Sequence, residues 1–332
     1  MLARLWRLGL LGLAAAAVLW AVWLGRQGHW AAALGGAVAL LCLHAWVLAL
    51  QFVLMWLQNR NDPAPPARWH ELLRAWWGEV LVCARVFGWR QAFREHALPD
   101  APHVPGRRGI VFIHGYLCNR ALWLPWFLRL RGLGVPYVSV SLEPVFASID
   151  AYVEQVEAAV RRIEHATGLA PLLVCHSMGG LAARAWLRCQ ATLDTGSAGR
   201  GDDRVHHVIT IGTPHHGTWA AAAANTPNGR QMRRQSDWLR ELARSETPDR
   251  RRRFTCFYGH CDSIVFPAST AVLPDAQCHH VRARAHVELL YEEVVFEAAL
   301  RQVDAGPAGT GALQGGSVGG TGPRQPPHLH EG

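Results

Sequence analysis

The feature that most constrains the fold is an apolar run that ends in a serine and two glycines. Residues 172–175 are Leu-Leu-Val-Cys, which is typical of a short strand buried on both of its faces. Ser177 follows, and the helical pattern of residues 178–188 begins directly after it. Gly179 and Gly180 carry no side chain, so the backbone can turn sharply and approach its neighbours there. This segment predicts an α/β sheet with Ser177 at the end of a strand.

The alternation of short apolar runs with longer helical patterns continues over most of the chain from Gly109 onward. It predicts a mostly parallel sheet with helices on both faces. One segment, at about residues 218–253, interrupts the alternation. We expect strands at residues 109–113, 136–142, 172–175, 205–211, 254–258 and 280–284, and helices at residues 149–166, 178–188 and 287–302.

Three motifs in this part of the chain resemble the lipase branch of the α/β-hydrolase superfamily. They are residues 112–116 (Phe-Ile-His-Gly-Tyr), 175–180 (Cys-His-Ser-Met-Gly-Gly) and 212–217 (Gly-Thr-Pro-His-His-Gly). The second is similar to the Gly-x-Ser-x-Gly nucleophile elbow, with Cys175 in place of the first glycine. The resemblance covers residues 109–303. It implies the α/β-hydrolase fold, and residues 218–253 resemble a cap over the active site.

The resemblance implies an oxyanion hole beside a nucleophilic Ser177. Attack by this serine on an ester puts negative charge on the carbonyl oxygen, and backbone N–H donors stabilise that charge. The family implies that the donors are the N–H groups of Tyr116 and Met178. Ser177 also lies at the start of the helix that follows it, where the helix dipole favours negative charge.

A serine of ordinary pKa is a weak nucleophile and needs a general base and an acid to orient that base. In the superfamily the order along the chain is serine, acid, histidine. Asp262 follows the strand expected at residues 254–258 and precedes an apolar pair. Its rivals, Asp202 and Asp203, lie in a loop rich in glycine and serine. We therefore expect Asp262 to be the acid.

His286 has the position expected of the base among the eighteen histidines. It follows the last expected strand and opens the last expected helix, whereas His279 and His280 fall earlier, within or before that strand. In a triad of this kind His286 would take the proton of Ser177 and return it to the leaving group, while Asp262 orients the ring.

The first sixty residues are much more apolar than the rest and predict two transmembrane helices. Residues 8–24 and 30–57 carry no Asp, Glu or Arg, and about 20 residues cross a bilayer core of about 30 Å. Several tryptophans lie near the expected interfaces, where their amphipathic rings are favoured. The alternative is a cleaved signal peptide followed by one span, but no clear cleavage site follows Leu24.

The arginines that flank these segments predict their orientation. Positive charge is enriched on the cytoplasmic side of membrane proteins. We therefore expect both ends of the hairpin in the cytoplasm and the catalytic domain at the cytoplasmic face of the plasma or inner membrane. The flanking arginines are Arg4 and Arg7 before the first span, Arg26 between the spans, and Arg60, Arg68 and Arg74 after the second.

Residues 61–108 connect the hairpin, residues 1–60, to a catalytic domain expected at 109–304. Within this bridge, residues 68–96 have apolar and aromatic side chains at helical spacing. Two interpretations of the apolar face stay open: it lies among lipid headgroups, or it packs on the catalytic domain. Residues 305–332 are rich in glycine and proline without an apolar period, and predict a disordered tail.

Charge and cysteine content restrict the partners and cofactors. The net charge is +8, but all 33 basic residues are arginine, as a coding bias would produce. The tryptophans gather in and after the apolar N-terminus, which favours lipid over nucleic acid. The eight cysteines form no CxxC pair, which fits a reducing compartment. We expect no metal and no organic cofactor, because no zinc spacing fits Cys256, Cys261, Cys278, His279 and His280.

Together these features predict a membrane-anchored serine hydrolase that cleaves the ester of a lipid or a similar apolar substrate through an acyl-Ser177 intermediate. An acyltransferase or thioesterase that uses the same triad is one alternative. A catalytically inactive scaffold at the membrane is another. The sequence leaves the oligomeric state open.

Overall fold

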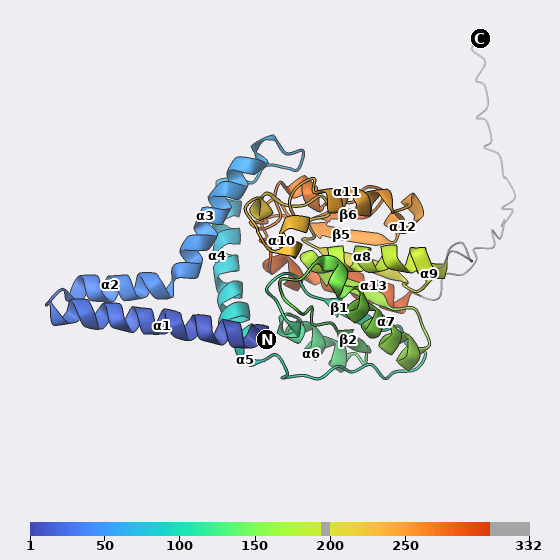
Figure 1. Ribbon diagram of the computed structural model, residues 1–332, viewed down its shortest axis with the longest axis horizontal. Coiled ribbons are helices and arrows are strands. Elements are labelled where there is room, and N and C mark those ends of the chain that lie inside the picture. Colours follow the sequence, from blue (N-terminus) through green and yellow to red (C-terminus); the bar gives the residue numbers. More distant parts are fainter. Residues whose placement is uncertain (194–199, 306–332) are drawn as a thin grey trace, which may run out of the picture.

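The computed structural model describes residues 1–193 and 200–305, with a six-stranded sheet at its centre (Figure 1). The strand order is β2-β1-β3-β4-β5-β6, and every neighbouring pair is parallel. This confirms the predicted α/β fold with a parallel sheet. The predicted disordered tail lies outside the described residues, apart from Ala305. The strands are β1 (Ile110–Ile113), β2 (Tyr137–Ser139), β3 (Leu172–His176), β4 (His207–Ile211), β5 (Phe254–Tyr258) and β6 (Gln277–His280).

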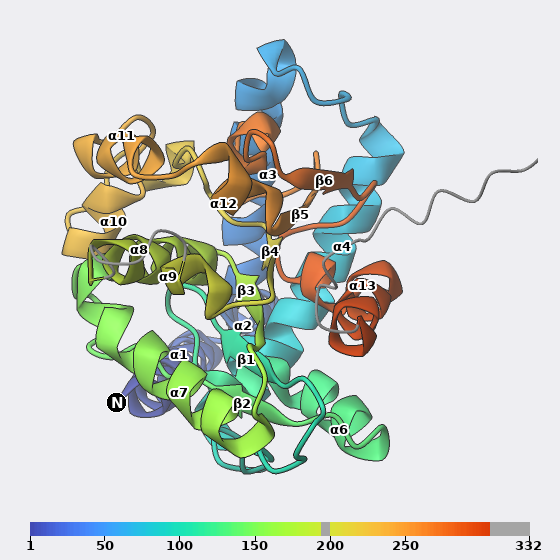
Figure 2. The same cartoon turned by 90° about the vertical axis from the view of Figure 1, so that its right-hand side faces the viewer.

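Four main helices cover the two faces of the sheet (Figure 2). α7 (Val153–Thr167) and α8 (Met178–Leu193) pack on one face, and α6 (Leu124–Gly132) and α13 (Glu293–Asp304) pack on the other. The buried residues of α7 recur every three or four positions, so one stripe of the helix faces the sheet.

Shorter helical segments connect these elements. Four of them lie between β4 and β5, in the segment predicted as a cap. The helix predicted over residues 287–302 is divided into a 3₁₀ turn and α13. The segments are η3 (Arg120–Trp123), η4 (Ile149–Tyr152), α9 (Arg200–Asp203), η5 (Trp219–Ala221), α10 (Pro227–Gln231), α11 (Asp237–Arg244), α12 (Pro248–Arg252), η6 (Ala268–Ala271) and η7 (Glu288–Tyr291).

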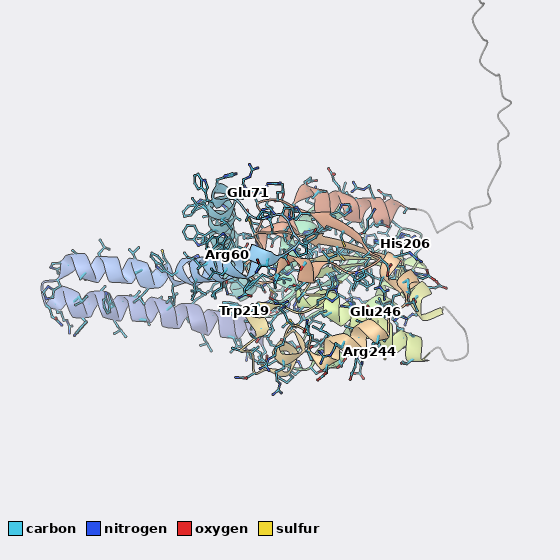
Figure 3. The ribbon with its side chains drawn as sticks, turned by 90° about the horizontal axis from the view of Figure 1, so that it is seen from above. Arg60, Glu71, His206, Trp219, Arg244 and Glu246 are labelled. Carbon is cyan, nitrogen blue, oxygen red and sulfur yellow. The ribbon has the colours of Figure 1, made fainter. Side chains whose placement is uncertain are left out.

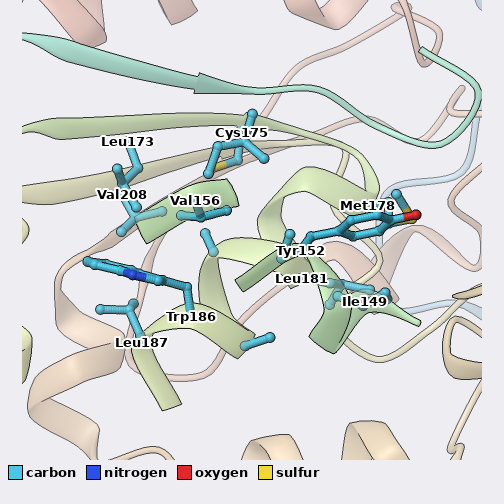
Figure 4. Close-up of a cluster of buried hydrophobic side chains, with 14 of the residues drawn as sticks. Ile149, Tyr152, Val156, Leu173, Cys175, Met178, Leu181, Trp186, Leu187 and Val208 are labelled. Atoms are coloured by element: carbon cyan, nitrogen blue, oxygen red, sulfur yellow. The ribbon is translucent and has the colours of Figure 1, made fainter. Parts of the chain in front are cut away.

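A large apolar cluster fixes α8 against the sheet (Figure 4). Trp186 of α8 is fully buried and belongs to this cluster with Val156 of α7 and Leu173 of β3. Its indole Nε1–H donates a hydrogen bond to Glu157 Oε2 at 2.8 Å, which supplies the acceptor that a buried indole needs. Because α8 begins directly after Ser177, this packing also determines where the serine lies.

The last predicted strand, residues 280–284, is displaced toward the N-terminus. β6 covers Gln277–His280, and its last ladder bond runs from the Val281 N–H to the carbonyl of Tyr258. Ala283 then has a φ of +53°, which ends the extended conformation. The prediction was wrong because β6 is an edge strand. Its side chains are half exposed, so the strand lacks the apolar run that marks an interior one.

The first apolar segment forms a single helix, α1 (Leu2–Arg26), long and apolar enough to cross a membrane. Only 11% of its most apolar 18-residue window is buried. α2 (Trp30–Leu41) folds back beside α1, where Trp20 Nε1 donates a hydrogen bond to the carbonyl of Ala32 at 3.1 Å. The pair extends from the rest of the molecule as an arm (Figure 1). Exposed apolar surface of this kind is typical of a contact with lipid.

The second predicted span, residues 30–57, is not one straight helix. It breaks at Cys42 into α2 and α3 (Leu43–Gln58), with a bend of 61°. At 1.5 Å per residue, α2 is about 18 Å long, less than the bilayer core of about 30 Å. After the break, α3 turns toward the α/β domain, where Phe52 and Met55 are buried, and η1 (Asn59–Asn61) follows. The structure therefore has one helix that could span a membrane, or two if the bent pair is one span.

Residues 68–96, predicted as one helix, form α4 (Trp69–Arg85), a π-helical turn (Val86–Arg90) and α5 (Gln91–Phe93). One face of α4 packs on the α/β domain, where Glu71, labelled in Figure 3, accepts two hydrogen bonds from Arg282 at 3.1 and 2.9 Å. The opposite face is apolar and exposed in the part of the chain that the structure describes. Because one face is packed and the other is exposed, the structure is compatible with both interpretations of this helix. Its exposed stripe consists of Trp69, Leu73, Trp77 and Leu81, which are 42–73% exposed.

Candidate active site

Ser177 lies at the turn between β3 and α8, where its backbone φ is +54°. A residue with a side chain in this left-handed region is strained by about 1–3 kcal/mol, and such strain is concentrated at functional sites. Two hydrogen bonds hold the turn. The N–H of Ser177 donates to the carbonyl of Ile211 at 2.9 Å, and Thr213 Oγ1 donates to the carbonyl of Ser177 at 2.8 Å. The sharp strand-to-helix turn predicted from the sequence is therefore present.

Three positions around the turn sterically exclude a side chain, whereas a fourth position accepts a small one. Cys175, the departure from the elbow motif, is fully buried in the apolar cluster on the α8 face, where a small side chain packs without displacing the turn (Figure 4). Glycine is needed at the other three. A Cβ would lie 2.3 Å from the carbonyl oxygen of Ile113 at Gly179, 2.3 Å from Thr213 Oγ1 at Gly180, and 2.7 Å from Ser177 Cβ at Gly115.

His286 and Asp262 form a buried hydrogen-bonded pair. His286 Nδ1 lies 2.8 Å from Asp262 Oδ2, and the two residues are 5% and 2% exposed. The other carboxylate oxygen accepts the N–H groups of Ile264 and Val265 at 2.9 and 2.8 Å, which fixes its orientation. With Nδ1–H donated to the carboxylate, Nε2 of the neutral ring is free to accept a proton. Burial lowers the pKa of His286, but the charges of Asp262 and Glu79 outweigh it, so this pKa is raised.

The structure brings the three predicted triad residues to the carboxyl end of the sheet. Ser177 follows β3, Asp262 follows β5, and Gly212 follows β4 between them. A Cβ on Gly212 would lie 3.0 Å from Asp262 Oδ2 and 3.1 Å from His286 Nδ1. The ring of His176, the residue before the serine, lies 4.6 Å from the ring of His286. Within the described residues no hydrogen bond joins the Ser177 hydroxyl to His286, and such bonds often tighten only when substrate is bound.

Tyr116 and Met178, the predicted oxyanion donors, both lie next to the serine turn. Met178 is the first residue of α8, so its N–H has no carbonyl partner within the helix. Tyr116 directly follows Gly115, which is in close contact with Ser177. These positions suit two N–H groups that point at one oxygen, and the role of the two residues stays a prediction.

Two residues for which the sequence predicted no individual role, His114 and Trp6, hold the loop that carries Tyr116. The N–H of Leu142 donates to His114 Nε2 at 3.1 Å, so Nδ1 carries the proton and donates to the carbonyl of Gly115 at 2.9 Å. Burial lowers the pKa of His114 to about 4, which keeps the ring neutral. From the N-terminal side, Trp6 Nε1 of α1 donates to the carbonyl of Leu117 at 3.2 Å.

A buried ion pair holds the motif of residues 212–217 beside the serine. Arg184 donates to Glu246 at 2.6 and 2.8 Å, and to the carbonyl of His215 at 2.9 Å. The side chains of Arg184 and Glu246 are 0% and 1% exposed, and Glu246 is labelled in Figure 3. The sequence does contain a signal for this pair, because Arg184 is the one charge in the otherwise apolar run of residues 178–187.

The cysteines and histidines grouped at residues 256–280 form no metal centre in the part of the chain that the structure describes. All eight cysteines are free thiols. His260 Nδ1 lies 2.7 Å from His280 Nε2, and Cys256 and Cys278 are neighbours across β5 and β6. Both contacts lie at the β5 and β6 side of the sheet.

The parallel sheet, the strained serine turn and the pair formed by His286 and Asp262 define an α/β-hydrolase fold, which is the fold that the three motifs implied. Solved structures with the same fold include Bacillus licheniformis lipase BlEst2 in its mature form, at 18% identity and a TM-score of 0.51, over 62% of this chain and 96% of that one. Aspergillus fumigatus lipase B is 20% identical with a TM-score of 0.50, over 59% of this chain and 54% of that one. No protein-family model and no curated protein matches this chain.

Proposed function

We propose that the protein is a membrane-anchored serine hydrolase that cleaves carboxylic esters of lipids through an acyl-Ser177 intermediate. The observation that carries the proposal is the buried pair of His286 and Asp262, 2.8 Å apart, at the same end of the sheet as a strained serine. A purely structural role would not require an imidazole nitrogen that is free to accept a proton and a serine with a strained backbone at the same end of the sheet.

Acylation uses the three side chains in sequence. His286 Nε2 takes the proton of the Ser177 hydroxyl while the oxygen attacks the carbonyl carbon of the ester. The N–H groups of Tyr116 and Met178 stabilise the negative oxygen of the tetrahedral intermediate. As the intermediate collapses, the ester C–O bond breaks and His286 gives its proton to the leaving alcohol. Asp262 stabilises the positive ring in between.

Deacylation repeats the same steps with a second acceptor. Water attacks the acyl-enzyme, His286 takes its proton, and the carboxylic acid leaves as Ser177 regains a hydrogen. An alcohol in place of water would give a new ester, which is acyl transfer with the same residues. Hydrolysis and transfer therefore differ in the acceptor and not in the triad.

The surface of the N-terminal segment supports a lipid substrate. α1 exposes an apolar surface along most of its length, and α4 adds the stripe of Trp69, Leu73, Trp77 and Leu81. Aromatic and apolar side chains on one face of a helix suit the boundary between headgroups and acyl chains. An enzyme held there meets esters that reside in the membrane. The two structures compared above are named lipases, which agrees with this substrate class.

For the anchor, we propose that α1 crosses the membrane, and that α2 with the apolar start of α3 returns the chain to the cytoplasmic side. The arginines in the first turns of α1 and those that follow α3 favour this orientation. A reporter fused to the C-terminus that is active only in the cytoplasm should then be active, and a periplasmic reporter at the same point should be inactive. The reverse result would place the catalytic domain on the outer side.

The substrate class is tested with p-nitrophenyl esters of increasing acyl length, hydrolysed by the full chain in detergent micelles. Each methylene that enters an apolar site contributes about 0.8 kcal/mol. We therefore expect kcat/KM to rise up to about fourfold per added methylene until the site is filled.

The Ser177→Ala variant, measured on the same ester series, is the control. Equal rates for the two proteins would contradict the serine mechanism. Activity that is lost in the variant but falls with acyl length would leave a serine esterase and remove the lipid substrate. Transfer of the acyl group to added glycerol, faster than release of the free acid, would assign the protein to acyl transfer.

A further inference from the structure

The loop that carries His286 rests on α4, a helix that precedes the catalytic domain in the chain. Glu71 pairs with Arg282 at 2.9 Å, at the start of this loop. One turn further along α4, Arg74 donates to the carbonyl of Ala283. These contacts join two segments more than 200 residues apart, so the position of the loop depends on the N-terminal segment.

Glu79 makes the contact closest to the catalytic histidine. Its carboxylate oxygens accept the N–H of Val287 at 2.9 and 3.1 Å, and Oε2 also accepts the N–H of Glu288 at 3.2 Å. The residue is 1% exposed. These two N–H groups belong to the residues directly after His286, where η7 begins and where no earlier turn supplies acceptors.

A glycine in the sequence of α4 allows the helix to approach this loop closely. Gly78 precedes the glutamate, and a Cβ at this position would lie 2.1 Å from Glu288 Oε1. The backbone of His286 is held from the other side as well, because His176 Nε2 lies 3.3 Å from the His286 carbonyl oxygen. The histidine is therefore fixed between the end of β3 and α4.

We propose that Glu79 is a positioning residue for His286: it fixes the backbone that follows the histidine, and its charge stabilises the protonated ring that forms during the reaction. The inference rests on the proposed serine-hydrolase function. It makes α4 part of the active site, although the sequence places this helix in the bridge between the membrane anchor and the catalytic domain. Glu79 does not touch the reacting atoms and acts through His286.

The charged and titratable groups around His286 come from three elements. Asp262 faces it from the loop after β5, His176 from the end of β3 and Glu79 from α4. Burial raises the pKa of Glu79 to about 7, and the N–H of Val287 and the charge of His286 oppose that rise. Cys83, one turn further along α4, is a partly buried thiol whose pKa is raised by desolvation and by the neighbouring charge of Glu79. The ionised form of Glu79 raises the pKa of His286, so its removal should lower that pKa.

The test uses the full chain with Glu79→Gln, which keeps the size and one acceptor oxygen but removes the charge. A lost hydrogen bond to a charged group is worth about 1.5–3 kcal/mol, so we expect kcat to fall roughly 10- to 100-fold with KM little changed. Because a protonated His286 cannot act as a base, the rate falls as the pH drops through its pKa. We expect this acidic limb to move to lower pH in Glu79→Gln.

The matched control is Glu71→Gln. Glu71 is also a buried carboxylate on this face of α4 and also contacts the loop, through Arg282, but it does not lie beside His286. This variant should keep the acidic limb of the parent. Glu79→Asp keeps the charge and shortens the side chain, so it should lower kcat and leave the limb near that of the parent. These results would support the proposal. If Glu79→Gln does not fold, the comparison of Glu79→Asp with Glu71→Gln still tests the proposal.

Three outcomes overturn the inference. They are a parental kcat and pH profile in Glu79→Gln, a limb shifted equally in Glu71→Gln, and a parental kcat in Glu79→Asp. Failure of the proposed function looks different. In that case the parent itself hydrolyses no ester and does not react with a fluorophosphonate probe that labels active serines.

Discussion

Replacement of Ser177 by alanine is expected to lower kcat for ester hydrolysis by about 10⁶-fold and to abolish labelling by a fluorophosphonate probe. The hydroxyl oxygen forms the covalent bond to the acyl group, and removal of a nucleophile that acts as a unit with its base costs about this much in a serine protease. The measurements are the initial rate of p-nitrophenyl ester hydrolysis and the fluorescence of probe-labelled protein after gel electrophoresis.

The Ser177→Ala variant keeps a side chain at a φ of +54°, so the backbone strain of the turn is unchanged. Alanine is also small enough for the close contact with Gly115. The thermal unfolding midpoint should therefore stay near that of the parent, which separates loss of the nucleophile from loss of the fold. A variant that is folded and still labelled by the probe would remove Ser177 from the mechanism, and a parent that is never labelled would favour a scaffold.

The second large effect is expected from Asp262→Asn, which should lower kcat by about 10⁴-fold, as in the equivalent change in a serine protease. The Asn side chain keeps an oxygen to accept the N–H groups of Ile264 and Val265. Its NH₂ group then faces His286 Nδ1, which must accept instead of donate. The ring proton moves to Nε2, and this nitrogen can no longer take the proton of Ser177.

The same variant changes the dependence of the rate on pH. Asp262 is the largest contribution that raises the pKa of His286 against burial, so loss of the charge should lower that pKa. The residual activity of Asp262→Asn should therefore persist to lower pH than the activity of the parent. An unchanged acidic limb in kcat/KM, measured from about pH 4 to pH 9, would mean that His286 is not the group that titrates.

The interior of the fold could be predicted from the sequence, because interior parallel strands are buried on both faces. β1, β3, β4 and β5 lie within two residues of their predicted bounds. β6 was displaced, since an edge strand with half-exposed side chains has no continuous apolar run. The bend at Cys42 was missed for a related reason: apolar content predicts that a segment avoids water and not whether it is straight.

The core of the candidate site was equally accessible to sequence reasoning, because its residues follow strands in a fixed order. Asp262 and His286 were expected to pair, and they lie 2.8 Å apart. Glu79 was missed, since its partners lie 208 and 209 residues away and no local pattern shows which surface a helix packs on. A signal was present: the carboxylate lies on the buried side of α4, near Ala75 and Val80, where an unpaired charge is costly.

The contact between Glu79 and Val287 also has a consequence for how the protein is made. A ribosome synthesises α4 first, and Val287, the partner of Glu79, follows 208 residues later. Until then Glu79 has no N–H group of this loop to accept, and the contact that fixes the backbone after His286 cannot form. If the protein is an ester hydrolase as proposed, the nascent chain should be inactive until residues 286–288 have been synthesised, and a premature stop codon upstream of residue 286 should release a protein without ester-cleaving activity.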